Sequence, residues 1–231
     1  VLYLVKSLCC LLLFLGVYHL FLIKEKMYQF NRWYLLVSIL MAFVIPAFTI
    51  TVEATKTTEM PITFQETEFI SDISPVLEPQ AQPIPYESYL LAIYLGISLM
   101  LLIYFCYNIY KLFVKINKSE KASYFQATVI LLKEKVQPHS FLKYIFINKK
   151  VYKKDQQEQL ILTHELAHVQ QKHSIDIVLL ELLNMLFWFV PIFKLYKKAI
   201  QLNHEFLADD AVIKTHKNVS EYQNLLLKLT T

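Results

Sequence analysis

The residues best suited to chemistry lie together in the segment from Leu162 to His173, which has the sequence LTHELAHVQQKH. It contains an H-E-x-x-H pattern formed by His164, Glu165 and His168. Residues four positions apart share one face of a helix, so both imidazoles can bind a single Zn²⁺. Glu165 lies beside the first histidine and can reach a water on that metal. The pattern predicts a zinc peptidase site. The alternative is an amphipathic helix that exposes two histidines by chance.

A catalytic zinc site needs a third protein ligand and an open position for water. Gln171 and Ser174 stand where the longer metzincin pattern has glycine and a third histidine, which directs attention to a carboxylate further along the chain. Glu205 and Asp209, four positions apart, can supply a ligand and an acid that orients a ligand histidine. They can equally form a solvated acidic face. The other downstream acids are Asp176, Glu181, Asp210 and Glu221. The first two of these are too close in sequence to fold back easily onto the same metal.

Local signals place the motif on a helix within a mixed helix and strand region. Asp155, followed three residues later by Glu158, is typical of a helix start, and this helix is predicted to run to about Lys172. The strand 141–148 is expected either as an edge strand that lines the cleft or as a purely structural strand. The remaining predictions are a strand at 125–132, a helix at about 193–213 and an amphipathic helix after Asn218.

Three apolar runs precede this region, and each is near the roughly 20 residues that a helix needs to cross a bilayer. They cover about 1–23, 33–52 and 88–110. Basic residues dominate the first short loop and the segment after Tyr110, whereas the loop 53–87 is acidic and rich in proline. The positive-inside rule then places the N-terminus outside and the site in the cytoplasm. The chain is accordingly divided into a transmembrane region, 1–110, and a metallopeptidase domain, 111–231.

Composition supports a membrane protein. Of the 231 residues, 55% are hydrophobic and 18% are charged, and the mean hydropathy is +0.38. An ordinary soluble domain is roughly 45–50% apolar and about 25% charged. Only 2 glycines are present, which excludes glycine-rich phosphate loops. The net charge of +4 reflects bases beside membrane ends rather than nucleic-acid binding. The three cysteines lie in apolar runs and are expected as packed or lipid-facing thiols: Cys9, Cys10 and Cys106.

A fourth apolar run, 175–190, raises a topological problem. If it crossed the bilayer, His164 and Glu205 would lie on opposite sides and could not share a metal. Both flanks of the run are basic, which favours a buried or re-entrant helix. A true fourth span is the alternative by length alone, and it would remove Glu205 from the site.

Several motifs together resemble the BlaR/MecR-type antirepressor membrane zinc metallopeptidases, which are gluzincins linked to the sensing of cell-wall antibiotics. The motifs are HELAH at 164–168, HSID at 173–176, FWFVP at 187–191 and EFLAD at 205–209. The resemblance covers roughly residues 125–229 by motif and the first three spans by layout. It implies that His164, His168 and Glu205 bind zinc and that Glu165 is the catalytic base.

The resemblance also bears on residues around the ligands. Asp209 resembles the family's acid that supports the zinc ligands. His173, His204 and His216 are expected as polar surface or supporting residues rather than ligands, and the resemblance favours His173 among them. Val190 stands where the family usually has asparagine. No extracellular penicillin-binding sensor is present in these residues, so a β-lactam response is not transferred.

The expected fold is mainly α: a polytopic protein of the bacterial cytoplasmic membrane with three N-terminal transmembrane helices and a cytoplasmic α+β zincin-like domain. The expected function is a regulatory zinc endopeptidase that cleaves itself or a cytoplasmic protein such as a transcriptional repressor. A housekeeping membrane protease and a non-proteolytic sensor or scaffold are the alternatives, and the intact Glu165 counts against the latter. The expected partners are the lipid bilayer and a protein or peptide substrate, with a homo-oligomer left open. The initial valine suggests a fragment of a longer protein.

Overall fold

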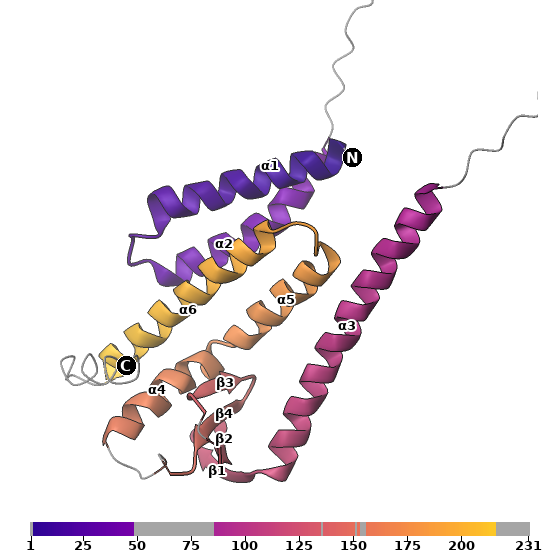
Figure 1. The fold of residues 1–231 in the computed structure, drawn as a ribbon. Coiled ribbons are helices and arrows are strands. Elements are labelled where there is room, and N and C mark those ends of the chain that lie inside the picture. The colour runs from indigo at the N-terminus through magenta and orange to yellow at the C-terminus, as the bar shows by residue number, and fades with distance from the viewer. Residues whose placement is uncertain (1, 49–85, 135, 151, 153–155, 216–231) are drawn as a thin grey trace, which may run out of the picture.

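A computed structural model describes residues 2–48, 86–134, 136–150, 152 and 156–215 of the chain. The described part is mainly helical and contains one small sheet (Figure 1). Four predicted features lie outside the described residues: most of the loop 53–87, the helix-start signal of Asp155 with the side chain of Glu158, the amphipathic helix after Asn218, and the side chains of His216 and Glu221.

Three helices correspond to the predicted spans, and among the described residues they are long and apolar enough to cross a membrane. Helix α1 (Leu2–Val17) continues as a π-helical stretch, Tyr18–Leu22. Helix α2 (Tyr28–Val44) ends in a 3₁₀ turn, Ile45–Ala47, and α3 covers Tyr86–Lys118. Helix α2 begins before the predicted span and includes Arg32, whose charge is paired inside the protein with Asp176.

The sheet has four strands in the order β1-β2-β4-β3. Strands β1 (Glu120–Tyr124) and β2 (Ala127–Leu132) are antiparallel, whereas β2 pairs in parallel with β4 (Tyr144–Asn148). The short strand β3 (His139–Phe141) pairs with β4 from the other side and forms the edge. The prediction of an edge strand at 141–148 is therefore wrong, because β4 is an inner strand.

Two tight turns explain why the predicted strands differ from the observed ones. Phe125, with φ of 48°, reverses the chain between β1 and β2, so the predicted strand 125–132 begins only at Ala127 and is preceded by an unpredicted partner. Leu142, with φ of 51°, does the same between β3 and β4. Bulky side chains rarely adopt positive φ, so the sequence carries no ordinary turn signal at either place.

Both faces of the sheet are covered by helices. On one face, Val129 and Ile147 pack against Leu166 of α4 (Gln156–Gln170). On the other face, Ile130 and Phe146 pack with Ile116 of α3. Alternate strand residues point to opposite faces, so β2 and β4 contribute to both layers. The sheet thus fixes α4, the helix that carries the H-E-x-x-H motif.

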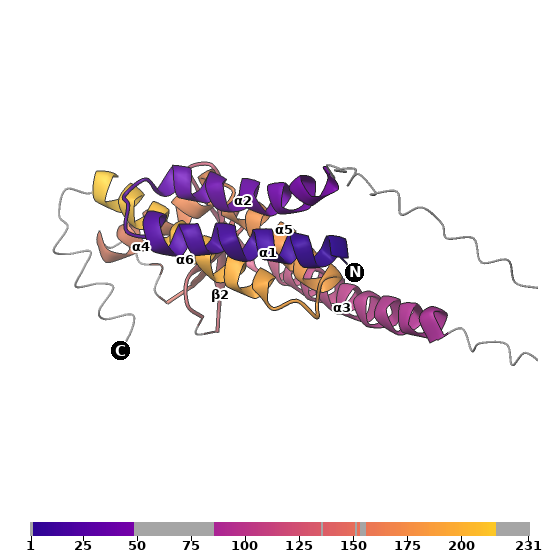
Figure 2. The ribbon, with the colours of Figure 1, turned by 90° about the horizontal axis from the view of Figure 1, so that it is seen from above.

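The remaining helices form a bundle with the first two. Helices α5 (His173–Leu186) and α6 (Ile192–Thr215) run in opposite directions, joined by a turn at 187–191, and α6 packs against α1, α2, α4 and α5 (Figures 1 and 2). Buried residues of all four bundle helices share one core, including Leu11, Leu35, Leu180 and Tyr196. Because α6 reverses the direction of α5, the chain returns to α4.

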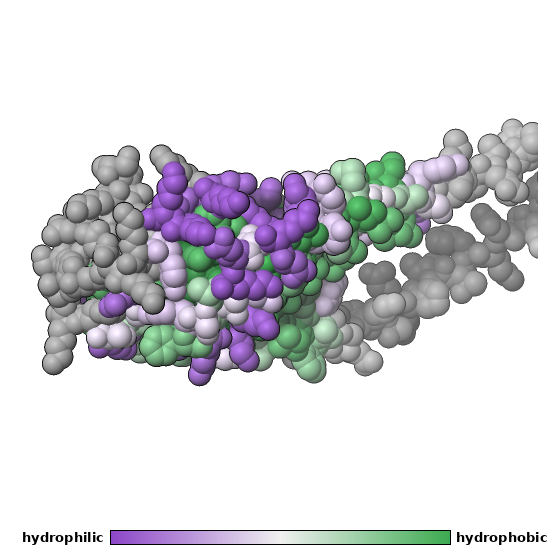
Figure 3. Space-filling model, turned by 90° about the horizontal axis from the view of Figure 1, so that it is seen from below, coloured by the Kyte–Doolittle hydropathy of each residue, from purple (hydrophilic) through white to green (hydrophobic). Residues whose placement is uncertain are grey.

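Polar and apolar surfaces are separated along the molecule. Seen from the end that carries the sheet, hydrophilic side chains gather over that end, whereas hydrophobic ones follow the helices (Figure 3). No residue in the most apolar window of α3 is buried within the protein. Helix α5 also exposes a stripe at helical spacing, formed by Ile175, Leu179, Leu182 and Leu186. These surfaces suit insertion of the helices into lipid, whereas the orientation of the protein in a membrane stays a prediction.

The hairpin of α5 and α6 predicts that Lys172 and Lys214 face the same side of a membrane. Single-cysteine variants Lys172→Cys, Lys214→Cys and Ser71→Cys would test this in a chain whose native cysteines are replaced by serine. A membrane-impermeant thiol reagent added to intact cells is expected to label only Ser71→Cys, in the predicted outer loop. Labelling of just one lysine position would contradict the hairpin, and labelling of both would reverse the predicted orientation.

Candidate metal centre

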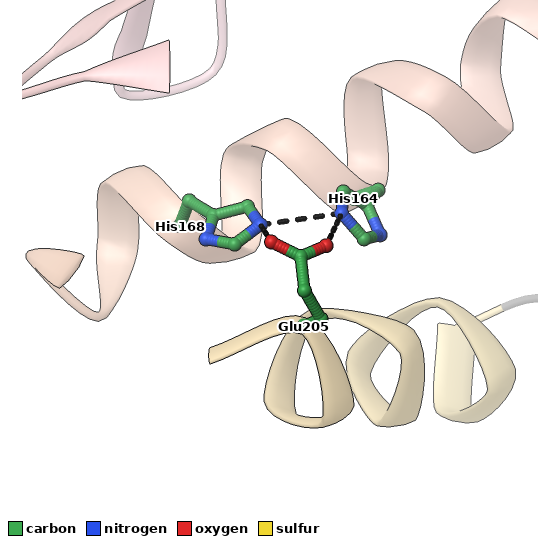
Figure 4. A group of neighbouring side chains, drawn as sticks. All are labelled: His164, His168 and Glu205. Atoms are coloured by element: carbon green, nitrogen blue, oxygen red, sulfur yellow. Dashed lines mark hydrogen bonds and ion pairs between the residues drawn. The ribbon is translucent and has the colours of Figure 1, made fainter. Parts of the chain in front are cut away.

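Helices α4 and α6 bring three candidate ligands to one point (Figure 4). The imidazoles of His164 and His168 lie on one face of α4, with their Nε2 atoms 3.2 Å apart. Glu205 of α6 directs its carboxylate between them, with Oε2 3.4 Å from His164 Nε2 and Oε1 3.8 Å from His168 Nε2. The ligand atoms of the three residues all lie within 4.8 Å of one another.

The spacing and chemistry of these atoms fit a tetrahedral metal ion. Zinc bonds to nitrogen and oxygen of about 2.0–2.2 Å correspond to about 3.3–3.6 Å between neighbouring ligand atoms. The two Nε2 atoms, 3.2 Å apart, are close to that value, as is Glu205 Oε2 at 3.4 Å from His164 Nε2, and one ligand atom from each residue lies within 4.8 Å of the others. Two imidazoles and one carboxylate are also a donor set of catalytic zinc sites, which keep a fourth position for water. The ligand role of each residue stays a prediction.

Each histidine has a partner on its other ring nitrogen. His164 Nδ1 lies 3.2 Å from the carboxylate of Asp209, and His168 Nδ1 lies 2.8 Å from His173 Nδ1. A histidine that binds a metal through Nε2 carries its proton on Nδ1 and donates it to such a partner. The structure thus places both predicted supporting residues, Asp209 and His173, where they can orient the two imidazoles.

The charges around His164 favour a positive charge on its ring. Burial disfavours a charged His164 ring, but its hydrogen bonds to Asp209 and Glu205 outweigh this and raise its pKa to about 9. Burial and the neighbouring charge of His164 lower the pKa of His168 to about 4. The hydrogen bond from His164 lowers the pKa of Glu205. The carboxylates therefore favour a positive charge at this point, which a divalent metal would supply in place of the proton.

Glu165 occupies the wall of a cavity beside the three ligands. The cavity has a volume of about 600 Å³ and is bordered by β3, α4 and α6. The side chain of Glu165 is buried, which raises the pKa of its carboxyl group, and it shares a hydrogen bond with Ser140 of β3. A buried carboxyl group with a raised pKa next to a metal site is suited to accept a proton and release it again.

The structure separates the other predicted acids from the ligands. Asp176, one of the candidates for the third ligand, instead accepts hydrogen bonds from Arg32 and His204. Glu181 is paired with Lys197, and Asp210 lies 2.6 Å from Lys214. Among the described residues, Glu205 is therefore the acid that completes a three-residue group with the two histidines.

Two residues near the site make contacts that sequence reasoning did not predict. His204, expected as a surface or supporting residue, is almost fully buried, at 3% exposure. Arg32 was predicted in the short loop before the second apolar run, but it lies in α2 with its side chain 12% exposed, and it reaches the neighbourhood of the site. The sequence gives no signal for this contact, because no spacing rule connects positions so far apart in the chain.

An H-E-x-x-H helix that faces a glutamate from a later helix is the arrangement expected of a metallopeptidase. Residues 143–231 match the model of the peptidase family described as BlaR1 peptidase M56. This stretch contains β4, α4, α5 and α6 with all three candidate ligands, and it confirms the predicted resemblance to BlaR/MecR-type peptidases. The family implies a metal cofactor. None of the curated proteins compared with the chain matches it.

Metal analysis of the detergent-purified chain tests the ligand set. About one zinc per chain is expected. His164→Ala and His168→Ala should lose the zinc, and Glu205→Ala should bind it more weakly, because each change removes a donor atom. Asp210→Asn is the matched control, since this acid lies on α6 but pairs with Lys214. Unchanged zinc content in both histidine variants would refute the site.

Zinc affinity is also expected to depend on pH. Zinc must displace the proton that His164 holds with a pKa of about 9, so affinity should rise about tenfold per pH unit between pH 7 and 8.5. His168, with a pKa of about 4, is neutral throughout this range. Titration against a competing chelator measures the slope. In Asp209→Asn, which lacks an acceptor that raises the pKa of His164, the rise should end at lower pH. A flat profile would contradict the assignment.

Proposed function

We propose that the chain is a membrane-anchored zinc endopeptidase with a regulatory role. The observation that carries this proposal is the cavity in which His164, His168 and Glu205 converge beside the buried Glu165. The family of residues 143–231 supports peptidase chemistry. An intact acid beside the ligands argues against a scaffold with a vestigial site, since binding alone has no need of a buried base.

Each residue of the site has a separate role in the proposed peptide hydrolysis. His164, His168 and Glu205 would hold zinc, which when bound supplies Lewis acidity and makes water a nucleophile near neutral pH. Glu165 takes the proton from the attacking water and passes it to the leaving amine nitrogen. Its burial raises its pKa toward the range in which both transfers are feasible. Asp209 and His173 hold the ligand histidines in the required orientation.

The edge strand β3 is the proposed binding site for substrate. It pairs with β4 on one side only and borders the cavity through His139, Ser140 and Phe141. An extended peptide can add to such an edge by backbone hydrogen bonds, with its side chains alternating between the cavity and solvent. Ser140, which contacts Glu165, would place the peptide backbone next to the base. The proposed substrate is thus an unfolded or extended protein segment.

The side of the membrane on which the site lies determines which proteins can reach it. Helices α1, α2 and α3 suit membrane spans, and the basic residues next to their ends favour a site in the cytoplasm. The proposed substrates are therefore the chain itself or a cytoplasmic protein, such as the transcriptional repressor that the family resemblance suggests. A regulatory role rests on that resemblance.

Replacement of the base separates catalysis from metal binding. Glu165→Gln keeps the size of the side chain and should retain zinc, while cleavage should slow by at least about 100-fold because the general base is lost. Cleavage of a fluorescently labelled, denatured protein in detergent, together with mass spectrometry of self-cleavage fragments, measures the effect. Asp210→Asn serves again as the control. Full activity in Glu165→Gln would require another catalytic group or another function.

A further inference from the structure

A chain of buried polar contacts extends from the candidate ligands into the bundle. It begins at His173, whose Nδ1 lies 2.8 Å from His168 Nδ1. The ring of His173 stacks on that of His204, with 3.8 Å between centroids and 5° between planes. The two rings are each 3% exposed. A metal ligand of α4 is thereby connected to side chains of α5 and α6.

The chain of contacts continues to the second helix of the protein. His204 Nε2 donates to Asp176 Oδ2 over 2.8 Å. The same carboxylate accepts two hydrogen bonds from Arg32, from Nε at 2.7 Å and from Nη2 at 3.2 Å. Arg32 belongs to α2, and its side chain is only 12% exposed. This two-pronged contact fixes the carboxylate more closely than a single bond would.

The direction of the hydrogen bonds shows how the buried network can orient His168. For His168 to present the lone pair of Nε2 to a metal, its Nδ1–H must donate to His173 Nδ1. His173 must then carry its own proton on Nε2, where Gln171 Oε1 accepts it at 3.3 Å. This arrangement requires a fixed plane for the His173 ring. Stacking on His204 supplies that plane, and the carboxylate of Asp176 holds His204 in turn.

We propose that Arg32 is a positioning residue for the metal centre, acting through Asp176 and His204 on His173 and thus on His168. The inference rests on the proposed function. Arg32 lies outside residues 143–231, so the family match does not assign it a role. The peptidase site is completed by a membrane helix: α2 must be docked correctly for His168 to bind zinc tightly.

Stability alone does not account for the ion pair. Buried ion pairs are often no more stabilising than apolar residues of similar volume, because both charges must be removed from water. A second pair in the same bundle, Lys197 of α6 with Glu181 of α5, has side chains that are 30% and 29% exposed, and neither of them lines the cavity. It provides a matched control for helix packing without a connection to the ligands.

Zinc affinity and cobalt spectra of the full chain in detergent test the inference. Arg32→Lys keeps the charge but loses the two-pronged contact, and His204→Phe keeps the stacked ring but loses the hydrogen bond. Both are expected to weaken zinc binding by about 10–100-fold, the usual effect of removing a group that supports a ligand. The absorption bands of bound Co²⁺ should change as well. Lys197→Gln should bind zinc like the wild type. Thermal unfolding of the metal-free chains verifies that each variant is folded.

The outcomes separate the inference from the proposed function. A wild-type chain that binds zinc, together with unchanged affinity and spectra in Arg32→Lys and His204→Phe, would overturn the inference alone. Equal weakening in Lys197→Gln would also overturn it, since general helix packing would then explain the effect. A wild-type chain without zinc would overturn both. If Arg32→Lys does not fold, the zinc affinity and cobalt spectrum of His204→Phe test the inference alone.

Discussion

Three ligand atoms from two helices must lie within a few ångströms of one point, and the arrangement of the whole protein follows from this constraint. Helix α4 is held in place by the sheet, whereas α6 is held by the bundle. The turn at 187–191 lets the chain reverse, so that Glu205 returns to His164 and His168. A straight passage of α5 through a bilayer, without this return, would separate the ligands by the thickness of the hydrocarbon core, about 30 Å.

The polar groups around the site can be buried because they form hydrogen bonds and ion pairs with one another. More than half of this chain is hydrophobic, yet His173, Asp176 and His204 lie almost fully buried between its helices. An unpaired polar group in such a place costs several kcal/mol in the extreme case, whereas a fully connected network avoids most of that cost. The same network restricts the rings to one orientation. Removal of any member would therefore affect both packing and the alignment of the ligands.

Local patterns in the sequence were sufficient for the motif helix, the three apolar helices and the pair Glu205 and Asp209, because each depends on spacing within a single element. The short strands β1 and β3 were not predicted, because each ends in a turn that is made by a residue with positive φ, Phe125 or Leu142. Bulky residues rarely adopt positive φ, so they give no sequence signal for such turns. The contact of Arg32 with Asp176 could not be predicted, since it depends on how two distant helices pack. Spacing predicted the candidate ligands, whereas packing between helices determined which residues surround them.

Helix α3 has a length that exceeds what a membrane span requires. Its 33 residues correspond to about 50 Å, against a hydrocarbon core of about 30 Å. If α3 crosses the bilayer, its last turns stand clear of the lipid, and Ile116 joins them to the sheet. The helix then acts as a spacer that holds β3 at a set height, up to about 20 Å from the hydrocarbon. Under the proposed function, a protein would be cut where an extended segment passes at that height, so the distance from the membrane would select the cleavage position together with the side chains around it.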